Sequence, residues 1–260
     1  MILGDFGTSY SKFLDLSSAS PKPYIIPSKE LTSGHKVAMA TGHNGKRFSD
    51  RYVNELTVLA RGGESLIIEK NFVLLDCGSH DIKFIHYIDG HLHDMGWNTE
   101  CGASMGFTIE LLARYYDLDY DELPIPDRPF SVTCGVLGMS RIFDAVVSGT
   151  PDSEAVARFV MGIAINAYRF AGSPSKLFLS GGLCDNPLFL SSFPCEIIPL
   201  GRFVLLKGLE AIIKQENQKP GTKAFMPFRV QRTWSNVGYR QLHSIYFTLH
   251  FMEGKCTTPA

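Results

Sequence analysis

Two stretches of the chain decide the fold: residues 2–12 read Ile-Leu-Gly-Asp-Phe-Gly-Thr-Ser-Tyr-Ser-Lys, and residues 73–83 read Val-Leu-Leu-Asp-Cys-Gly-Ser-His-Asp-Ile-Lys. In each, a short apolar run typical of a buried strand leads into an acidic turn that contains glycine and ends in lysine. The carboxylates are Asp5 and Asp76, and the turn residues are Gly7, Thr8 and Ser9 in the first stretch and Gly78 and Ser79 in the second. Glycine lets backbone amides face an anion. Two such turns facing one another would hold the phosphates of a nucleotide and its Mg²⁺.

Either turn alone favours an ordinary β-hairpin, because Asp-x-Gly is common turn chemistry. A third stretch makes the pair harder to dismiss: residues 177–187 read Leu-Phe-Leu-Ser-Gly-Gly-Leu-Cys-Asp-Asn-Pro, an apolar strand that ends at Gly181 and Gly182 before a predicted helix. Glycines at that point would let the backbone lie flat against an adenosine. The three stretches together predict a nucleotide site.

The order of two phosphate loops and one adenosine loop resembles that of the superfamily of acetate kinase, sugar kinases, Hsp70 and actin. More narrowly, the chain is similar to the ATPase activators of 2-hydroxyacyl-CoA dehydratases and to the related ATPase subunits of benzoyl-CoA reductase. The narrower resemblance covers residues 2–214 and rests on Ala40-Thr-Gly-His-Asn-Gly, Asp76-Cys-Gly-Ser-His-Asp-Ile-Lys, Asn98-Thr-Glu-Cys-Gly-Ala-Ser-Met-Gly-Phe, Ser131-Val-Thr-Cys-Gly-Val-Leu and Ser180-Gly-Gly-Leu-Cys-Asp-Asn. It implies an α/β, two-lobed actin-like ATPase (ribonuclease H-like) fold, with the nucleotide in the cleft between the lobes.

The resemblance also implies roles for individual residues. Asp5 and Asp76, the expected catalytic pair, would hold Mg²⁺ through water. The ATP phosphates would contact Gly7, Thr8, Ser9, Lys12, Gly78 and Ser79, and the adenosine would be bordered by Gly181, Gly182 and Asn186. Relatives have Gly-Gly-Gln where this chain has Gly78-Ser79-His80, so nucleotide binding is a safer expectation than hydrolysis. His80 itself is expected to be a solvated turn residue.

Two of the six cysteines precede predicted helices. Cys101 and Cys134 would each lie at or near a helix N-terminus, where unpaired amides and the helix dipole favour the metal-binding thiolate. Their spacing contains no CxxC pattern and by itself favours cysteines packed under a helix. The resemblance implies instead that they bind one [4Fe–4S] cluster shared between the two subunits of a homodimer. The remaining cysteines are expected to be ordinary free thiols: Cys77, Cys184, Cys195 and Cys256.

Composition sets broad limits on function. The chain has 260 residues, 45% of them hydrophobic and 20% charged, which suits one or two globular domains. A formal net charge of −1 gives no electrostatic reason to expect nucleic acid or an anionic membrane. No apolar run approaches the roughly 18 residues that span a bilayer, and the first residues read as a strand rather than as a signal peptide. We therefore expect a cytoplasmic protein.

The mixture of strands and helices predicts two α/β lobes. Residues 1–96 are expected to form the first ATPase lobe, residues 97–201 the second lobe with the two candidate ligand cysteines, residues 202–214 a helix that returns to the first lobe, and residues 215–260 an atypical C-terminal extension. The first lobe is expected to be reduced, because Lys12 and Ala40 lie too close for the long helix of the relatives. Strands are predicted near 1–4, 11–16, 22–27, 36–41, 72–77, 82–88, 91–95, 129–133, 176–180 and 195–198, and helices near 49–62, 106–116, 135–148, 152–172, 186–193 and 202–214.

The function implied by the resemblance is that of an ATP-dependent one-electron donor. Reduced by ferredoxin or flavodoxin, it would pass an electron to an iron–sulfur dehydratase or reductase, and the nucleotide would gate transfer by changing the angle between helices at 102–116 and 135–148. Two alternatives stay open. A small-molecule kinase of the same fold would need a carboxylate base, for which Asp81 and Asp94 are candidates. A non-catalytic nucleotide-binding regulator would agree with the altered loops and the extension.

Overall fold

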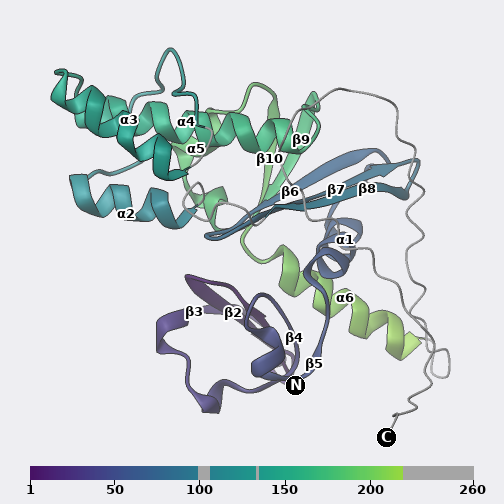
Figure 1. Cartoon of the computed structure of the whole chain (residues 1–260). Coiled ribbons are helices and arrows are strands. Elements are labelled where there is room, and N and C mark those ends of the chain that lie inside the picture. Colours follow the sequence, from purple (N-terminus) through teal and green to yellow (C-terminus); the bar gives the residue numbers. More distant parts are fainter. Residues whose placement is uncertain (99–105, 133–134, 219–260) are drawn as a thin grey trace, which may run out of the picture. The chain divides into compact units, whose positions relative to one another are not determined.

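The computed structural model describes residues 1–98, 106–132 and 135–218 (Figure 1). These residues form two five-stranded sheets with helices packed against them. The predicted α/β architecture with two sheet-based lobes is therefore confirmed. The described part of the chain contains no helix that is both long and apolar enough to cross a membrane.

The first sheet has the strand order β3-β2-β1-β4-β5. Its strands are β1 (Ile2–Phe6), β2 (Tyr10–Asp15), β3 (Pro23–Pro27), β4 (Val37–Thr41) and β5 (Ser49–Tyr52). β1, β2 and β3 form an antiparallel meander, whereas β4 lies parallel to β1 and β5 parallel to β4. This arrangement brings the carboxyl ends of β1 and β4 to the same edge of the sheet.

The first sheet has an aromatic cluster on one face. All of residues 1–54 are described, and none of them is α-helical. Phe6 and Phe13 are fully buried there with their rings edge to face, and Phe48 stacks on Phe6 at 5.0 Å. Because aromatic side chains bury a large area each, a few of them cover this sheet face in a short segment that has no helix.

The predicted helix at residues 49–62 was wrong at its start. Residues Ser49–Tyr52 form β5, and α1 runs over Glu55–Leu66. The helix begins after Asn54, whose side chain accepts a hydrogen bond from the N–H of Leu56 at 3.0 Å. An N-cap of this kind satisfies one of the unpaired donors at a helix start, which explains the boundary.

The second sheet has the strand order β10-β9-β6-β7-β8. Its strands are β6 (Phe72–Cys77), β7 (Ile82–Ile88), β8 (His91–Asn98), β9 (Lys176–Ser180) and β10 (Glu196–Gly201). β6 is central and buried along its whole length. β7 and β8 join through Asp89 and Gly90, which have φ values of 53° and 77°. Two consecutive positive φ values suit the right-handed twist of a hairpin.

The predicted lobe boundary near residue 96 differs from the sheet topology. β6, β7 and β8 precede that boundary, yet they belong to the second sheet, because β6 pairs directly with β9. We propose that the boundary lies between β5 and β6 instead, in the stretch that contains α1. Sequence pattern alone does not reveal this, since a strand's partner in the sheet is set by tertiary pairing and not by its neighbours in the chain.

Helices cover the second sheet. They are α2 (Gly106–Tyr116), α3 (Gly135–Val147), α4 (Asp152–Phe170) and α5 (Pro187–Ser191). Side chains of β6 and β9 and of these helices form one core. The strand predicted at 129–133 was wrong for residues 129–132: the N–H of Phe130 bonds to the carbonyl of Arg158 on α4 at 2.9 Å, and an ideal Cβ on Gly162 would lie 2.4 Å from the Phe130 carbonyl oxygen. The segment thus lies across a helix.

A pair of helices lies between the sheets (Figure 1). α6 (Val204–Gln218) packs on α1 and also contacts β1 and β4, while α1 contacts β7. Glycines bring the two helices close together, since an ideal Cβ on Gly62 would lie 2.5 Å from the carbonyl oxygen of Val204, and one on Gly208 would lie 2.0 Å from that of Val58. α6 continues into the predicted extension as far as Gln218, and the rest of residues 215–260 lies outside the described residues.

Candidate functional site

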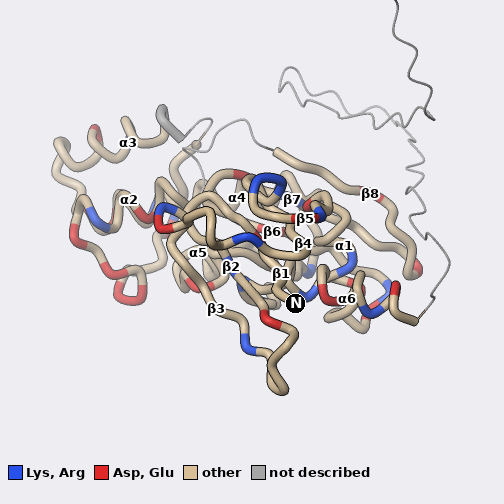
Figure 2. The backbone as a smooth tube through the Cα atoms, turned by 90° about the horizontal axis from the view of Figure 1, so that it is seen from below, with Lys and Arg blue, Asp and Glu red and all other residues tan. Residues whose placement is uncertain are grey.

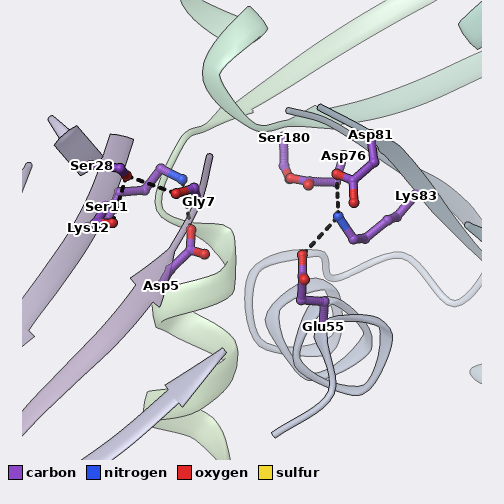
Figure 3. A network of polar contacts seen from close by, with 10 residues as sticks. All are labelled: Asp5, Gly7, Ser11, Lys12, Ser28, Glu55, Asp76, Asp81, Lys83 and Ser180. Carbon is purple, nitrogen blue, oxygen red and sulfur yellow. Dashed lines mark hydrogen bonds and ion pairs between the residues drawn. The ribbon is translucent and has the colours of Figure 1, made fainter. Parts of the chain in front are cut away.

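The first loop follows β1 and is fixed by side chains of the same lobe (Figure 3). Asp5 is only 2% exposed, and Lys12, its register partner on β2, donates a hydrogen bond from Nζ to Asp5 Oδ2 at 2.7 Å. Ser28 Oγ donates to the carbonyl of Gly7 at 2.8 Å and lies 2.9 Å from Ser11 Oγ. The end of β1 therefore presents a buried carboxylate that is paired with a partly buried lysine on β2.

Thr41 lies beside Asp5 and was not among the residues predicted from sequence. Parallel pairing of β4 with β1 makes Thr41 the register partner of Asp5, so both side chains lie on the same face of the sheet. Thr41 is completely buried, and its Oγ1 has no hydrogen-bond partner; Ser9 Oγ is in the same state. Leaving a buried hydroxyl unpaired costs about 1–3 kcal/mol. Such groups at a strand end are donors and acceptors available to a ligand. The sequence signal was the position of Thr41 in the Ala40-Thr-Gly stretch.

The loop after β4 packs tightly against the end of β1. Gly42 has φ of +90°, and an ideal Cβ there would lie 2.6 Å from the nitrogen and the oxygen of Phe6. The N–H of Asn44 also donates to the Phe6 carbonyl at 3.4 Å. Only glycine adopts this conformation and this close approach at low cost, which explains the glycine after Thr41.

The second loop follows β6. Asp76 is 6% exposed and accepts a hydrogen bond from Ser180 Oγ on the neighbouring strand β9. Burial raises the pKa of Asp76 above its ordinary value, although the charges of Lys83 and Lys12 and the Ser180 hydrogen bond oppose this shift. The loop closes through the N–H of Gly78, which donates to the carbonyl of Asp81 at 3.1 Å.

A buried lysine, Lys83, contacts the last residue of this loop, Asp81 (Figure 3). Lys83 is 1% exposed, and its Nζ lies 2.8 Å from Glu55 Oε2 and 2.6 Å from Asp81 Oδ1. Burial lowers the pKa of Lys83, but the charges of Glu55, Asp81 and Asp76 outweigh burial and raise the pKa overall. Burial raises the pKa of Glu55 to about 7, against the opposing charge of Lys83. Glu55 was not predicted, because the contact joins residues that are distant in the sequence.

The two loops lie close to one another. The charge of Asp5 is one of the causes that raise the pKa of Asp76, and that of Lys12 acts in the opposite direction. The imidazole rings of His43, after β4, and His80, in the second loop, have centroids 5.9 Å apart. Both histidines are exposed, as expected for a solvated His80. Asp5 and Lys12 of the first sheet and Asp76 and Lys83 of the second thus lie in one region of the protein (Figure 3).

The third loop begins at Gly181, which has φ of +97°. An ideal Cβ at Gly181 would lie 2.2 Å from the carbonyl oxygen of Cys77, whereas one at Gly182 would meet no atom within 4 Å. Gly181 therefore lets the loop pass against β6, and Gly182 borders open space. The side chain of Asn186 caps α5 by accepting the N–H of Phe189 at 2.8 Å. Its amide oxygen thus has a structural partner.

A cavity of about 500 Å³ lies next to the third loop. It is lined by Asp185, Asn186, Pro187 and residues 117–121. The segment after α2 contributes three aspartates to the lining of this cavity. Acidic residues on this segment appear red next to α2 in Figure 2. Its lining includes Asn186, one of the residues predicted to border the adenosine.

Cys101 and Cys134, the predicted cluster ligands, lie outside the described residues, as does Cys256. Cys77 and Cys184 are buried free thiols, and burial raises the pKa of both, that of Cys184 to about 12. Cys195 is free and half-buried. Within residues 1–98, 106–132 and 135–218 no group of three or more His, Cys, Asp or Glu side chains has an arrangement that would hold a metal ion.

Comparison with curated proteins identifies relatives of one kind, while no family model matches the chain. The activator of lactoyl-CoA dehydratase from Anaerotignum propionicum is 26% identical over 160 residues, which cover 57% of this chain and 61% of that protein. The (R)-2-hydroxyglutaryl-CoA dehydratase activating ATPase from Acidaminococcus fermentans is 25% identical over a region of the same extent. The sequence match thus spans about three fifths of the length of these curated relatives.

Solved structures of two such activators share the fold. Component A of the A. fermentans (R)-2-hydroxyglutaryl-CoA dehydratase superposes with a TM-score of 0.70 at 19% identity, covering 84% of this chain and 98% of that one. The activator of the 2-hydroxyisocaproyl-CoA dehydratase from Clostridium difficile, solved with bound ADPNP, gives a TM-score of 0.64 at 19% identity and covers 85% of this chain and 98% of that one. The chain is thus similar in sequence to activators of 2-hydroxyacyl-CoA dehydratases, and it shares the actin-like ATPase fold of the two solved structures.

Proposed function

We propose that this chain binds a magnesium nucleotide between its first and second loops and acts as an ATP-dependent activator, a one-electron donor, of an iron–sulfur 2-hydroxyacyl-CoA dehydratase or reductase. The observation that carries the nucleotide site is that Thr41, whose buried hydroxyl has no hydrogen-bond partner, is the strand-register partner of Asp5, and that the charge of Asp5 acts on Asp76. The relatives named as dehydratase activators support the second part of the proposal, and one of them was solved with ADPNP.

The residues present fit a magnesium nucleotide. Mg²⁺ prefers carboxylate and water oxygens, and Asp5 and Asp76 would hold it through water. Lys12 lies 2.7 Å from Asp5 and would share its ammonium group with the phosphates. The unpaired hydroxyls of Ser9 and Thr41 are available as further donors. Thr8, Gly7, Gly78 and Ser79 would complete the contacts to phosphate, with Gly181, Gly182 and Asn186 along the adenosine.

Asp76 must be ionised to take part in binding Mg²⁺. Burial raises its pKa, and the nearby lysines Lys83 and Lys12 favour the ionised form. Arrival of a dication would favour that form further. We therefore expect nucleotide binding to depend on Mg²⁺ and to release a proton where Asp76 is protonated in the free protein.

Cys101 and Cys134 are the proposed thiolate ligands of a [4Fe–4S] cluster shared between two subunits. α2 begins at Gly106, five residues after Cys101, and α3 begins at Gly135, directly after Cys134. Thiolates at or near helix N-termini are stabilised by unpaired amides and by the helix dipole. When bound, the cluster supplies one-electron transfer, for which ferredoxin or flavodoxin is the proposed electron source.

An apolar face on α2 and α3 supports the proposed homodimer. Three side chains of α2, spaced four residues apart, are about half exposed or more: Phe107 (48%), Leu111 (47%) and Tyr115 (73%). On α3, Phe143 is 48% exposed and Val147 is 88% exposed, and the rings of Tyr115 and Phe143 lie 6.5 Å apart. Contiguous exposed apolar surface marks an interaction site. A second copy docked here would place α2 and α3 of the two subunits against each other.

Anaerobic purification of the full chain tests the proposal. We expect a brown dimer with four iron and four sulfide per dimer, and binding of Mg²⁺-ADPNP by calorimetry. Cys101→Ser and Cys134→Ser are each expected to lose the cluster while the monomer remains folded. A colourless, iron-free protein would exclude the electron-transfer function, and absence of ADPNP binding would exclude the nucleotide site.

The contacts of Asp81, one of the two candidate kinase bases, disfavour the alternative of a small-molecule kinase. Asp81 accepts hydrogen bonds on both carboxylate oxygens, from Lys83 and from Trp97, each at 2.6 Å. Asp94 is exposed on β8 and accepts the N–H of Met95. A general base must be free to reach the acceptor hydroxyl, and Asp81 is not. The absence of a phosphorylated product in the presence of ATP and sugars would agree with this conclusion.

A further inference from the structure

Asp81 connects the second loop to Lys83 on β7 and to Trp97 on β8. Its carbonyl oxygen accepts the N–H of Gly78, which closes the loop at 3.1 Å. One carboxylate oxygen accepts from Lys83 Nζ at 2.6 Å, and the other accepts from the indole N–H of Trp97 on β8 at 2.6 Å. Lys83 Nζ also lies 5.1 Å from the centroid of the Trp97 ring. Asp81 is thus held from two sides by groups that do not themselves belong to the loop.

Lys83 extends this network to the start of α1. Its Nζ lies 2.8 Å from Glu55 Oε2, and both side chains are more than nine-tenths buried. A buried ion pair that has lost one partner is strongly unfavourable, so Glu55, Lys83 and Asp81 respond to one another as a unit. α1 packs against α6, the helix that also contacts β1 and β4. A movement of Asp81 would therefore be transmitted through Lys83 and Glu55 to α1, and from α1 to α6.

The second loop is also hydrogen-bonded to the start of α2. The N–H of Gly106 donates to the carbonyl of Gly78, and the N–H of Phe107 donates to the carbonyl of Ser79, both at 3.2 Å. An ideal Cβ on Gly106 would lie 3.1 Å from the Gly78 oxygen, so the helix end approaches the loop closely. The loop at residues 78–81 is therefore hydrogen-bonded both to β8, through Trp97, and to the start of α2.

We propose that Asp81 is a positioning residue that fixes the second loop for phosphate binding and transmits occupancy of that loop to β8 through Trp97 and to α1 through Lys83 and Glu55. This inference rests on the proposed nucleotide site. A phosphate bound at Gly78 and Ser79 adds negative charge beside Asp81, and Lys83 is the buried cation placed to balance both. The Asp81–Trp97 bond then changes in length or geometry, and Trp97 becomes a reporter of the bound state.

Tryptophan emission tests this proposal in the full chain. The sequence has two tryptophans, Trp97 and Trp234, so Trp234→Phe leaves Trp97 as the single emitter. Titration of this parent with Mg²⁺-ADPNP is expected to change the emission of Trp97 with the same midpoint as calorimetry. Adding Asp81→Ala is expected to weaken ADPNP binding about tenfold and to reduce the saturating emission change to less than about one fifth of that of the parent. Asp89→Asn, in the turn of the same hairpin, is the matched control and is expected to behave as the parent.

A second variant covers the case in which Asp81→Ala does not fold. Trp97→Phe removes the indole donor and keeps a ring next to Lys83. In the unmodified chain, ADPNP is expected to slow amide hydrogen exchange in β8 and at the start of α2. In Trp97→Phe the effect on β8 is expected to vanish, while ADPNP affinity changes less than threefold and the effect at α2 remains.

The outcomes separate this proposal from the proposed function. If ADPNP binds to the parent by calorimetry but the Trp97 emission does not change, Asp81 does not transmit occupancy and the inference is overturned. A full emission response in the Asp81→Ala variant would overturn it as well. If the parent binds no ADPNP at all, the nucleotide site and the inference that rests on it both fail.

Discussion

Lys12 Nζ lies 2.7 Å from Asp5 Oδ2 across β1 and β2, and both side chains are largely buried. Mg²⁺ prefers carboxylate and water oxygens as ligands, and the Asp5 carboxylate lies at the end of the strand that leads into the first loop. A change of charge at Asp5 therefore acts directly on the proposed site of Mg²⁺ and phosphate.

Asp5→Asn is expected to weaken Mg²⁺-ADPNP binding at least tenfold, or about 1.4 kcal/mol. The substitution keeps the size of the side chain and removes the charge that orders the waters of Mg²⁺. Calorimetry with Mg²⁺ and with EDTA measures the effect, which is expected only with Mg²⁺. Asp15→Asn, at the exposed end of β2, is the control and is expected to leave the affinity unchanged. Equal affinities of Asp5→Asn and the unmodified chain would remove Asp5 from the site.

Thr41→Val separates stability from binding. The hydroxyl of Thr41 is buried without a partner, so its replacement by a methyl group is expected to raise the free energy of unfolding by about 1 kcal/mol or to leave it unchanged. The same change is expected to weaken ADPNP binding about threefold to tenfold. Urea unfolding and calorimetry measure the two effects, with Thr57→Val on α1 as control. A clear loss of stability would show that Thr41 has a structural partner and no ligand role.

Glu55 predicts a specific dependence of stability on pH. Burial raises its pKa to about 7, whereas the unfolded chain ionises near its ordinary value of 4.5. Between these values the folded protein keeps a proton that the unfolded chain has released, so the free energy of unfolding falls as pH rises, by at most about 1.4 kcal/mol per pH unit. Glu55→Gln is expected to reduce this slope between pH 4.5 and 7.

Chemical denaturation at several pH values measures the slope. Glu30→Gln, an exposed carboxylate in the first lobe, is the matched control and is expected to leave it unaltered. The prediction is contradicted if Glu55→Gln shows the same pH dependence as the unmodified chain. That result would mean that Lys83 holds Glu55 ionised throughout this range.

Gly181→Ala and Gly182→Ala form a pair with opposite expectations. At Gly181 a Cβ would meet the Cys77 carbonyl oxygen at 2.2 Å in a backbone with φ of +97°, so we expect a loss of stability of more than about 2 kcal/mol. At Gly182 a Cβ meets no atom within 4 Å, and stability is expected to change little. If the adenosine lies along this loop, Gly182→Ala weakens ADPNP binding. Thermal unfolding and calorimetry distinguish the two substitutions.

The apolar face of α2 and α3 predicts the oligomeric state. Val147→Glu places a charge on a side chain that is 88% exposed, and it is expected to shift the dimer toward monomer by at least tenfold in the dissociation constant. Ile68→Glu, at a residue that is fully exposed after α1, is the control and is expected to leave the dimer intact. Analytical ultracentrifugation measures both variants. A dimer that tolerates Val147→Glu would place the interface elsewhere.

Local patterns in the sequence predicted many of the elements of this fold. Alternating and continuous apolar runs indicated β1, β6 and β9, and Asp89-Gly90 indicated the hairpin between β7 and β8. The prediction failed at β5 and at residues 129–132, where the outcome depended on a contact with another element. Ser49–Tyr52 becomes a strand because β4 offers an edge, and Phe130 lies across α4 because Gly162 leaves room.

The candidate site also contains residues that the sequence predicted and contacts that only the structure revealed. The sequence by itself determined which residues end the strands, since Asp5, Gly7, Asp76 and Gly181 follow apolar runs whose burial is a local property. Only the tertiary structure decided that Thr41 lies beside Asp5 and that Glu55 pairs with Lys83. These contacts join segments far apart in the chain, and burial sets their energies. Burial and proximity are properties of the assembled sheets and helices, so no short stretch of sequence carries them.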